Sequence, residues 1–473
     1  MAASILWHDY ETWGLDPKHD FPVQFAGIRT DLDFNIIGKP LNFYCQIPND
    51  YLPHPQACLV TGLTPQKSLR DGYLEHEFAE KIVQQLIQPE TCSAGYNSMK
   101  FDEEVTRNML YRNFWPVYDR EYKGGNSRWD IIDLVRAAYA LRPDGIEWPL
   151  YDDGKPCFKL EELSQANGLE HASAHDALSD VYATIGLAKL IKEKQPKLYD
   201  YYWGLRDKHK VAQQIDVIQH TPFLHISGYI SSSQGCCTWM MPVAHHSTNK
   251  NAIIAIDLGK DISVLSEQSL ASLREVGQLD ELYKARKVPL MQISLNKVPF
   301  VASAKTLSPA NAQRLGIDRK YCLANYEKLK QIPDLIEKCH AMTERDLSLL
   351  PTPDIDAQLY TRDFPSSADS QWKKGVIDSA PEALTVLFEK TDNPLLQKQL
   401  MRYIGRNYPN LMDEKELNLW QAHRRERFLL GSDKKYLSLE AFAQQIQLLA
   451  NEYAHDPKKL GILSKLEAYA RDV

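Results

Sequence analysis

The amino-acid sequence predicts an α/β domain at the N-terminus, a small β-rich domain after it and an all-helical domain at the C-terminus. Strand-like and helix-like patterns alternate up to about residue 196. Short β-type runs broken by Gly, Ser and Asn turns follow, and helical periodicity dominates after Leu350-Pro351-Thr352-Pro353. The 473 residues also exceed what one hydrophobic core usually supports. We therefore expect three domains, at 1–196, 197–349 and 350–473.

The N-terminal domain is expected to alternate short strands with longer helices, and Pro196 is expected to stop its last helix. The expected strands are 5–12, 24–30, 41–47 and 91–96. The expected helices are 77–87, 102–114, 130–141, 160–166 and 176–194.

The other two domains show different patterns. Runs at 223–230, 252–256 and 290–295 are typical of strands and predict a small barrel-like β domain. Near the C-terminus, apolar residues recur at steps of three and four, with Ser438 placed to cap the start of the helix. These apolar residues are Leu439, Phe442, Ile446, Leu449 and Tyr453.

Composition excludes several classes of protein. Charged residues make up 25% and hydrophobic residues 44%, the balance of an ordinary globular protein. No apolar run approaches the roughly 18 residues of a membrane span, and no signal peptide is recognisable, so we expect a cytoplasmic protein. The net charge of -7 disfavours a general nucleic-acid coat protein, so positive charge for a nucleic acid must be local.

The eight cysteines are scattered along the chain, and none forms a Cys-x-x-Cys pair or a cluster with zinc spacing. We therefore expect reduced, mostly buried thiols.

The first candidate site residues are Asp9 and Glu11, which interrupt an apolar and aromatic strand. Residues two apart on a strand project from the same face, roughly 6 to 7 Å apart, so these carboxylates face out together. That spacing suits a shared cation, although a solvent-facing edge strand with two acids is the commoner explanation of such a pair taken alone.

Two later motifs add to this pair. Asp102 leads a helix after Gly95-Tyr96-Asn97, where an acidic residue is also favoured by the helix dipole. Asp180 lies on a small, mostly apolar stripe that should face the protein, where an unpaired carboxylate is costly. His175, five residues earlier, points into the same site only if it sits at or before the helix start. The four carboxylates and the histidine together predict a catalytic site.

In this order, Asp9, Glu11, Asp102, His175 and Asp180 resemble the exonucleases named for Asp, Glu, Asp, Asp plus a histidine, which have a ribonuclease H-like fold. Carboxylates within a few ångströms repel one another unless cations neutralise them, and hard oxygen ligands favour Mg²⁺, with Mn²⁺ as a substitute. Two such ions activate water and stabilise the leaving 3′ oxygen of a phosphodiester. His175 is the candidate general base.

The resemblance extends to the bacterial exonuclease I family, 3′ to 5′ enzymes for single-stranded DNA in which three domains enclose the strand in a positively lined channel. The segments that carry it, spread over all three expected domains, are His8 to Thr12, Val60 to Pro65, Phe101 to Asn108, Asn126 to Asp130 and Asp356 to Tyr360.

The resemblance implies roles for individual residues. Asp9, Glu11 and Asp180 would bind the metal, Asp102 would complete the cluster and Glu11 would also touch the substrate. Cationic side chains would contact the phosphates of the strand, and aromatic rings would stack on its bases. These implied contacts are Arg107, Tyr118, Tyr122, Arg136, Lys159, Lys208 and Asn251.

The sequence departs from the family pattern at three positions. Trp13 replaces a common threonine, which we expect to affect the substrate cleft. Lys159 and Tyr122 stand where Arg and Trp are expected, which removes a bidentate phosphate contact and reduces stacking area. Basic runs at 208–210 and 424–427 are candidates for the channel lining or for the acidic tail of single-stranded-DNA-binding protein. For 424–427 we favour a solvated helix face.

The resemblance thus implies a monomeric, processive exodeoxyribonuclease that releases 5′ mononucleotides and acts in DNA repair and recombination. A 3′ to 5′ exoribonuclease with the same site is an alternative, which the two extra domains disfavour. A noncatalytic DNA-binding scaffold is another, which the presence of all five catalytic side chains disfavours.

Overall fold

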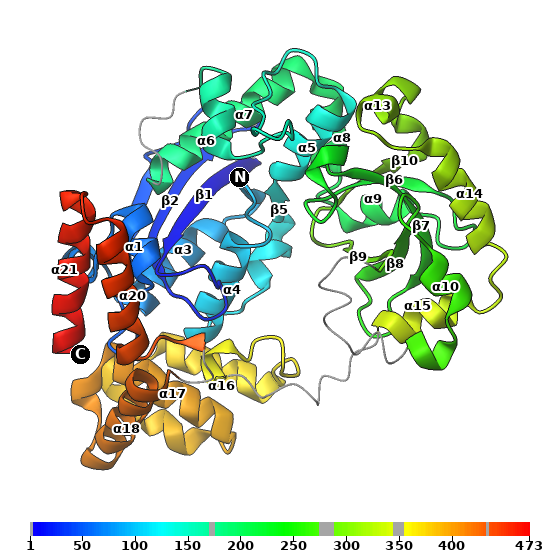
Figure 1. The fold of residues 1–473 in the computed structure, drawn as a ribbon. Helices are drawn as coiled ribbons and strands as arrows, with labels where there is room; N and C mark the ends of the chain where they lie inside the picture. The colour runs from blue at the N-terminus through cyan, green and yellow to red at the C-terminus, as the bar shows by residue number, and fades with distance from the viewer. Residues whose placement is uncertain (1–2, 170–175, 274–287, 344–353, 432–434) are drawn as a thin grey trace. The chain divides into compact units, whose positions relative to one another are not determined.

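The computed structural model describes residues 3–169, 176–273, 288–343, 354–431 and 435–473 (Figure 1). The chain forms two compact units. The first comprises Met1–Ser127, Ala172–Tyr182 and Thr352–Val473, and the second Arg128–His171 and Ala183–Pro351. The N-terminal α/β elements and the C-terminal helices therefore belong to the same unit.

The first sheet has the strand order β3-β2-β1-β4-β5. Strand β2 is antiparallel to both β1 and β3, whereas β4 runs parallel to β1. Strand β1 is therefore central, which explains its run of buried apolar residues. The bounds are β1 (Ser4–Thr12), β2 (Pro22–Thr30), β3 (Leu41–Tyr44), β4 (Thr91–Gly95) and β5 (Ser127–Asp130).

Helices α3 and α4 cover one face of this sheet. Leu6, Tyr10 and Phe25 pack there against apolar side chains of both helices, including Phe78 and Met109. This core fixes α4 against β1. The helical elements before β5 are α1 (Pro55–Thr61), α2 (Pro65–Asp71), α3 (Glu75–Leu86), α4 (Asp102–Arg112) and the 3-10 turns η1 (Asp119–Glu121) and η2 (Lys123–Gly125).

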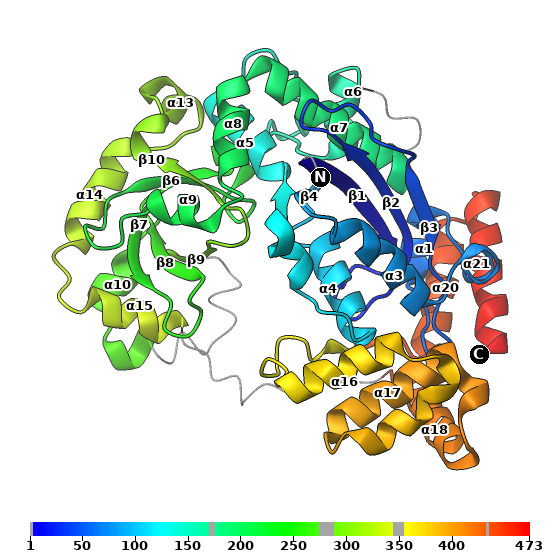
Figure 2. The ribbon, with the colours of Figure 1, turned by 180° about the vertical axis from the view of Figure 1, so that it is seen from behind.

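The C-terminal part is helical, as predicted. In Figures 1 and 2, α20 and α21 lie beside α1, and Phe442 and Leu466 share a core with Phe21 and Tyr51. Ser438 caps α20 by accepting from the N–H of Ala441. The elements are η6 (Ile355–Ala357), α16 (Ser367–Asp378), η7 (Pro381–Ala383), η8 (Thr385–Lys390), α17 (Pro394–Asn407), η9 (Pro409–Leu411), α18 (Glu414–Leu430), α20 (Leu439–Glu452) and α21 (Pro457–Asp472).

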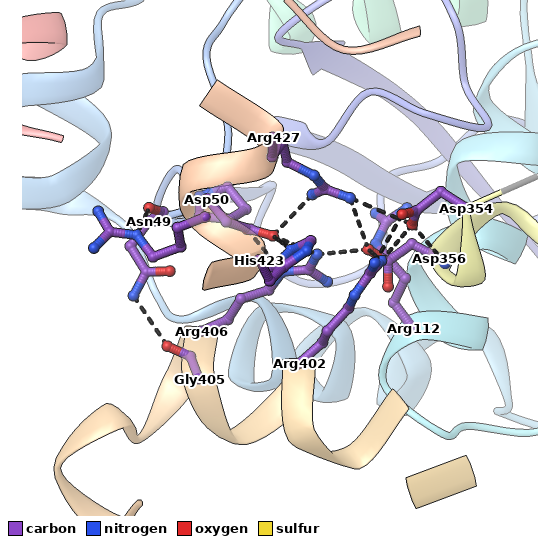
Figure 3. A network of polar contacts seen from close by, with 12 residues as sticks. Asn49, Asp50, Arg112, Asp354, Asp356, Arg402, Gly405, Arg406, His423 and Arg427 are labelled. Carbon is purple, nitrogen blue, oxygen red and sulfur yellow. Dashed lines mark hydrogen bonds and ion pairs between the residues drawn. The ribbon is translucent and has the colours of Figure 1, made fainter. Parts of the chain in front are cut away.

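A buried ionic network joins the C-terminal helices to the N-terminal part. Figure 3 shows its guanidinium and carboxylate groups converging. We call it the Asp–Arg network: Asp50, Asp354, Asp356, Arg402, Arg406 and Arg427. Arg427 is only 1% exposed, so the prediction of a solvated face for 424–427 is wrong at this position. Its charge is tolerated there because the carboxylates of Asp50, Asp354 and Asp356 compensate it.

The second unit contains a five-stranded antiparallel sheet in the order β10-β6-β7-β8-β9, as expected for a small β domain. Helix α5 packs on β6, β7 and β10. The strands are β6 (Phe223–Ile226), β7 (Cys237–His245), β8 (Ala252–Asp257), β9 (Leu290–Ser294) and β10 (Phe300–Ser303).

Helices and turns complete this part of the chain. Pro196 separates α7 from α8 and is itself the first residue of α8. The elements are α5 (Ile132–Leu141), α6 (Leu160–Ala166), α7 (Ala177–Lys194), α8 (Pro196–Gly204), α9 (Lys208–Gln213), η3 (Ser232–Gln234), α10 (Ser263–Glu267), η4 (Ala304–Thr306), α13 (Pro309–Arg314), α14 (Arg319–Leu329) and α15 (Leu335–Thr343).

Several predicted bounds were wrong. The helix expected over 130–141 begins at Ile132, because Asp130 ends β5 and its carboxylate accepts from the N–H of Ile132. The helix expected over 102–114 ends at Arg112, since Phe114 adopts a positive φ of 64°. The strand expected over 41–47 ends at Tyr44.

All eight cysteines are buried, as expected.

Candidate active site

Strand β1 presents Asp9 and Glu11 on the face away from α3 and α4. The alternate residues His8 and Tyr10 are buried and place their rings 5.7 and 5.0 Å from the ring of Phe25. Asp9 and Glu11 are each partly exposed within an otherwise buried strand. The predicted same-face arrangement of the two carboxylates is confirmed.

Asp180 joins this pair from the first turn of α7. Each of Asp9, Glu11 and Asp180 offers one carboxylate oxygen, and these oxygens all lie within 4.8 Å of one another. The turn is held by Asp176, whose Oδ2 accepts from the N–H of Ser179 at 3.3 Å. We call these three residues the carboxylate cluster. His175, the expected base, lies outside the described residues.

Asp102 is not one of the three residues of the carboxylate cluster and instead contacts the backbone of β1. It is 3% exposed, and its Oδ1 accepts a hydrogen bond of 3.0 Å from the backbone N–H of Tyr10. The parallel ladder between β1 and β4 ends where Trp7 pairs with Ala94, so Tyr10 lies beyond it. Asp102 thus links the start of α4 to the segment of β1 that carries Asp9 and Glu11.

The environment of the cluster disfavours negative charge. Burial, and then the neighbouring carboxylates of Asp102, Glu11 and Asp180, raise the pKa of Asp9 well above its usual range. Burial together with Asp180 and Asp102 raises the pKa of Glu11 to about 8. A bound divalent cation would remove this penalty, because its charge favours the ionised carboxylates.

The donor set of the cluster fits a hard divalent ion. It consists of carboxylate oxygens, which suit Mg²⁺ and Mn²⁺ rather than thiophilic metals. Two of these oxygens belong to groups whose pKa values are raised in the absence of a cation.

Three of the expected strand contacts lie in the first unit. Tyr122 is 62% exposed, and Tyr118 is half-buried. Arg107 is buried instead: its Nε and Nη2 donate to the carboxylate of Glu121 at 2.8 and 3.0 Å, and its Nη1 donates to Glu104 at 2.9 Å. The structure therefore places Arg107 inside an ionic cluster, with its charge compensated by two carboxylates.

The other four expected contacts lie in the second unit. The Nζ of Lys208 donates to Oδ1 of Asn251 at 3.2 Å, so two residues 43 positions apart in the sequence are neighbours. Lys159 is exposed at the N-cap of α6. Arg136 donates to Asp133 at 2.7 Å.

Two positions were not anticipated from the sequence. Trp13, expected at the cleft, is 1% exposed and packs in the core with Phe21 and Phe442, so that expectation was wrong. From the sequence, Tyr360 has no expected role beyond its place in a segment that resembles the family. In the structure, its hydroxyl contacts both Glu104 and Arg107. Residues 256 positions apart leave no local pattern that would predict such a contact.

Comparisons with known proteins cover almost the whole chain. A family model described as Exonuclease matches residues 6–188, one described as Exonuclease I SH3-like domain matches 206–345, and one described as Exonuclease I C-terminal domain matches 353–473. These matches confirm the predicted fold class, with an exonuclease domain followed by a small barrel-like domain and a helical domain.

Individual relatives are similar over their full length. The chain is 43% identical to Exodeoxyribonuclease I of Escherichia coli (strain K12) over 480 residues, covering 100% of this chain and 98% of that protein. It is similar to the crystal structure of E. coli Exonuclease I in complex with a dA16 oligonucleotide, with a TM-score of 0.93, 43% identity and 99% of each chain covered. It is also similar to the crystal structure of SSB/Exonuclease I in complex with the inhibitor CFAM, with a TM-score of 0.92, 43% identity and 100% of each chain covered. Among the described residues, no helix is long and apolar enough to span a membrane.

Proposed function

The chain belongs to the exonuclease I family, and we propose that this exodeoxyribonuclease digests single-stranded DNA processively from the 3′ end and releases 5′ mononucleotides. The observation that carries the proposal is the carboxylate cluster of Asp9, Glu11 and Asp180 within 4.8 Å. In support, a relative of the same length and fold was crystallised with a dA16 oligonucleotide.

Within this proposal, Asp9, Glu11 and Asp180 would hold two Mg²⁺ ions. When bound, the ions supply Lewis acidity for water activation and for the charge of the leaving oxygen. Glu11 also touches the substrate. Asp102 keeps β1 in place through the N–H of Tyr10. His175 accepts the proton of the attacking water, as the order of motifs in the sequence suggests.

Strand binding is proposed for residues of both units. Lys208 and Asn251 are neighbours and present an ammonium group and an amide to a phosphate. Tyr118 and Tyr122 offer rings on which bases stack, which is worth about 1 to 3 kcal/mol per base. The remaining proposed contacts are Arg107, Arg136 and Lys159.

The wider biological setting is proposed on the same basis. A relative crystallised as SSB/Exonuclease I supports single-stranded-DNA-binding protein as a partner. We propose a monomer in the cytoplasm, with domains at 1–196, 197–349 and 350–473 and a role in DNA repair.

One assay tests the proposal. Single-stranded DNA, RNA and duplex oligonucleotides, each labelled at the 5′ end, are incubated with Mg²⁺, and the product ladders are read over time. We expect single-stranded DNA to shorten progressively from its 3′ end while RNA and duplex persist. Loss of RNA with intact DNA would establish an exoribonuclease instead, and binding without cleavage would establish a scaffold.

A further inference from the structure

Tyr360 lies against one face of α4, although it belongs to the C-terminal part of the chain. Its hydroxyl donates to Oε2 of Glu104 and accepts from Nη1 of Arg107 at 3.1 Å. One turn further along the same face, the hydroxyl of Tyr111 donates to the carbonyl of Ile355 at 3.2 Å. Residues at these spacings share one side of a helix, so the segment from Ile355 to Tyr360 runs along α4.

The Asp–Arg network holds this segment in place. The carboxylate of Asp356 accepts from Arg402 at 2.8 Å and from Arg406 at 2.5 Å, and Arg406 also reaches Asp50 at 2.8 Å (Figure 3). Asp356 is 2% exposed. Groups buried with compensating charges resist displacement, because separating them leaves an unpaired charge. The position of Tyr360 is therefore set by the C-terminal helices.

Tyr360 in turn restricts Arg107. The guanidinium uses Nε and Nη2 on Glu121 and Nη1 on Glu104 and Tyr360. Four of its five donors are thus engaged within the first unit. A guanidinium held on two sides in this way has one orientation.

The guanidinium of Arg107 lies over the ring of Tyr118. The guanidinium carbon lies 5.4 Å from the ring centroid, within the range of a cation–π contact. The ring of Phe364, which is 84% exposed and four residues after Tyr360, meets Tyr118 at 6.2 Å and 62°. Two of the contacts of Tyr118 thus involve Arg107, which Tyr360 helps to hold, and Phe364, which lies in the same segment as Tyr360.

We propose that Tyr360 is a positioning residue for strand binding: its hydroxyl holds Arg107 and so fixes the ring of Tyr118 for stacking against a base of single-stranded DNA. This inference rests on the proposed function, because it takes Tyr118 as a strand contact. Fixing a ring before binding reduces the ordering cost of association. The C-terminal helices thereby contribute to binding through a residue that need not touch the strand.

The test uses Tyr360→Phe, which removes only the hydroxyl. Binding of a fluorescein-labelled oligothymidylate is measured without divalent metal, and steady-state hydrolysis is measured with Mg²⁺. We expect Kd and KM to rise about three- to tenfold, because the hydrogen bonds through which the hydroxyl holds Glu104 and Arg107 are lost. We expect kcat to change less than about twofold, since the carboxylate cluster is untouched. Tyr321→Phe, which removes the hydroxyl of a similarly exposed tyrosine in the second unit, is the matched control and should change neither constant.

A double-mutant cycle distinguishes positioning from a general loss of stability. If Tyr360 acts through Tyr118, Tyr360→Phe has no further effect on Kd in the Tyr118→Ala background. Additive losses in the double variant overturn the inference, as does an unchanged Kd in Tyr360→Phe or a loss confined to kcat. If the parent protein neither binds nor hydrolyses single-stranded DNA, the proposed function fails. An active parent with an unaltered Tyr360→Phe variant overturns this inference alone.

Discussion

The backbone N–H of Tyr10 donates a 3.0 Å hydrogen bond to Oδ1 of Asp102. Tyr10 stands between Asp9 and Glu11 on β1, and Asp102 is the first residue of α4. A second contact, from the hydroxyl of Thr106 to that of Tyr10 at 3.0 Å, joins the same helix and strand. The spacing of the two metal-binding candidates on β1 therefore depends on where α4 begins.

Replacing Asp102 tests this dependence. Asp102→Asn keeps an oxygen that can accept from Tyr10, whereas Asp102→Ala leaves the buried N–H without that acceptor. We expect the alanine variant to be less stable than the asparagine variant by about 1 to 3 kcal/mol in urea unfolding. We also expect its Mn²⁺ affinity to fall about 10- to 100-fold, as for other residues that orient metal ligands. Equal stability of the two variants would contradict the positioning role.

Removing Asp180 separates catalysis from stability. Asp180→Ala should abolish turnover, because one of three clustered carboxylates is lost. Its melting temperature without metal should equal or exceed that of the parent, since the substitution relieves repulsion that raises the pKa values of Asp9 and Glu11. Activity gels and thermal melts in EDTA check both statements. A variant that cuts at the parental rate shows that Asp180 has no catalytic role.

The pKa of Glu11 predicts the pH dependence of metal binding. Without metal, the folded protein keeps this proton up to about pH 8, whereas the unfolded chain releases it near its ordinary value. Metal-free stability attributable to Glu11 should therefore fall as the pH rises through that window. Mg²⁺ must displace the proton, so affinity should rise with pH up to about 8 and then level off.

Calorimetry measures this proton directly. Titrations with Mg²⁺ in buffers of different ionisation enthalpy should show proton release at about pH 6.5 and much less at about pH 9, on either side of the pKa of about 8. Glu11→Gln should release fewer protons than the parent at the lower pH. Equal proton release at both pH values would show that Glu11 does not titrate in this window.

Salt dependence tests the proposed phosphate contact of Lys208. Lys208→Gln should reduce the slope of log K against log salt for single-stranded DNA by about 0.7, the loss of one phosphate contact. Lys330→Gln, which removes an exposed charge paired with Glu327, is the control and should leave the slope unchanged. A Lys208 variant with the parental slope would remove this residue from the strand path.

The sequence alone predicted those features of the site and fold that depend on local periodicity. The two-residue spacing of Asp9 and Glu11 predicted their shared face, and the apolar stripe around Asp180 predicted that its carboxylate turns toward the protein. Ser438 was correctly placed as a cap, since capping depends on residues within one turn.

The sequence did not predict those features that depend on tertiary contacts between residues far apart along the chain. Strand β5 is too short to give a pattern of its own, and its Trp129 is buried by contacts that form only in the fold. Arg427 looks like a surface charge in sequence because its partners Asp50 and Asp356 are distant along the chain. Trp13 was misplaced for the same reason.

A crystal of this protein soaked in Mn²⁺ and measured for anomalous scattering tests the carboxylate cluster as a metal site directly. We predict a strong peak coordinated by carboxylate oxygens of Asp9, Glu11 and Asp180. The peak should be absent in crystals of Asp180→Ala grown and soaked in the same way. A parent crystal without a peak at these three carboxylates, or with Mn²⁺ bound only elsewhere, would contradict it.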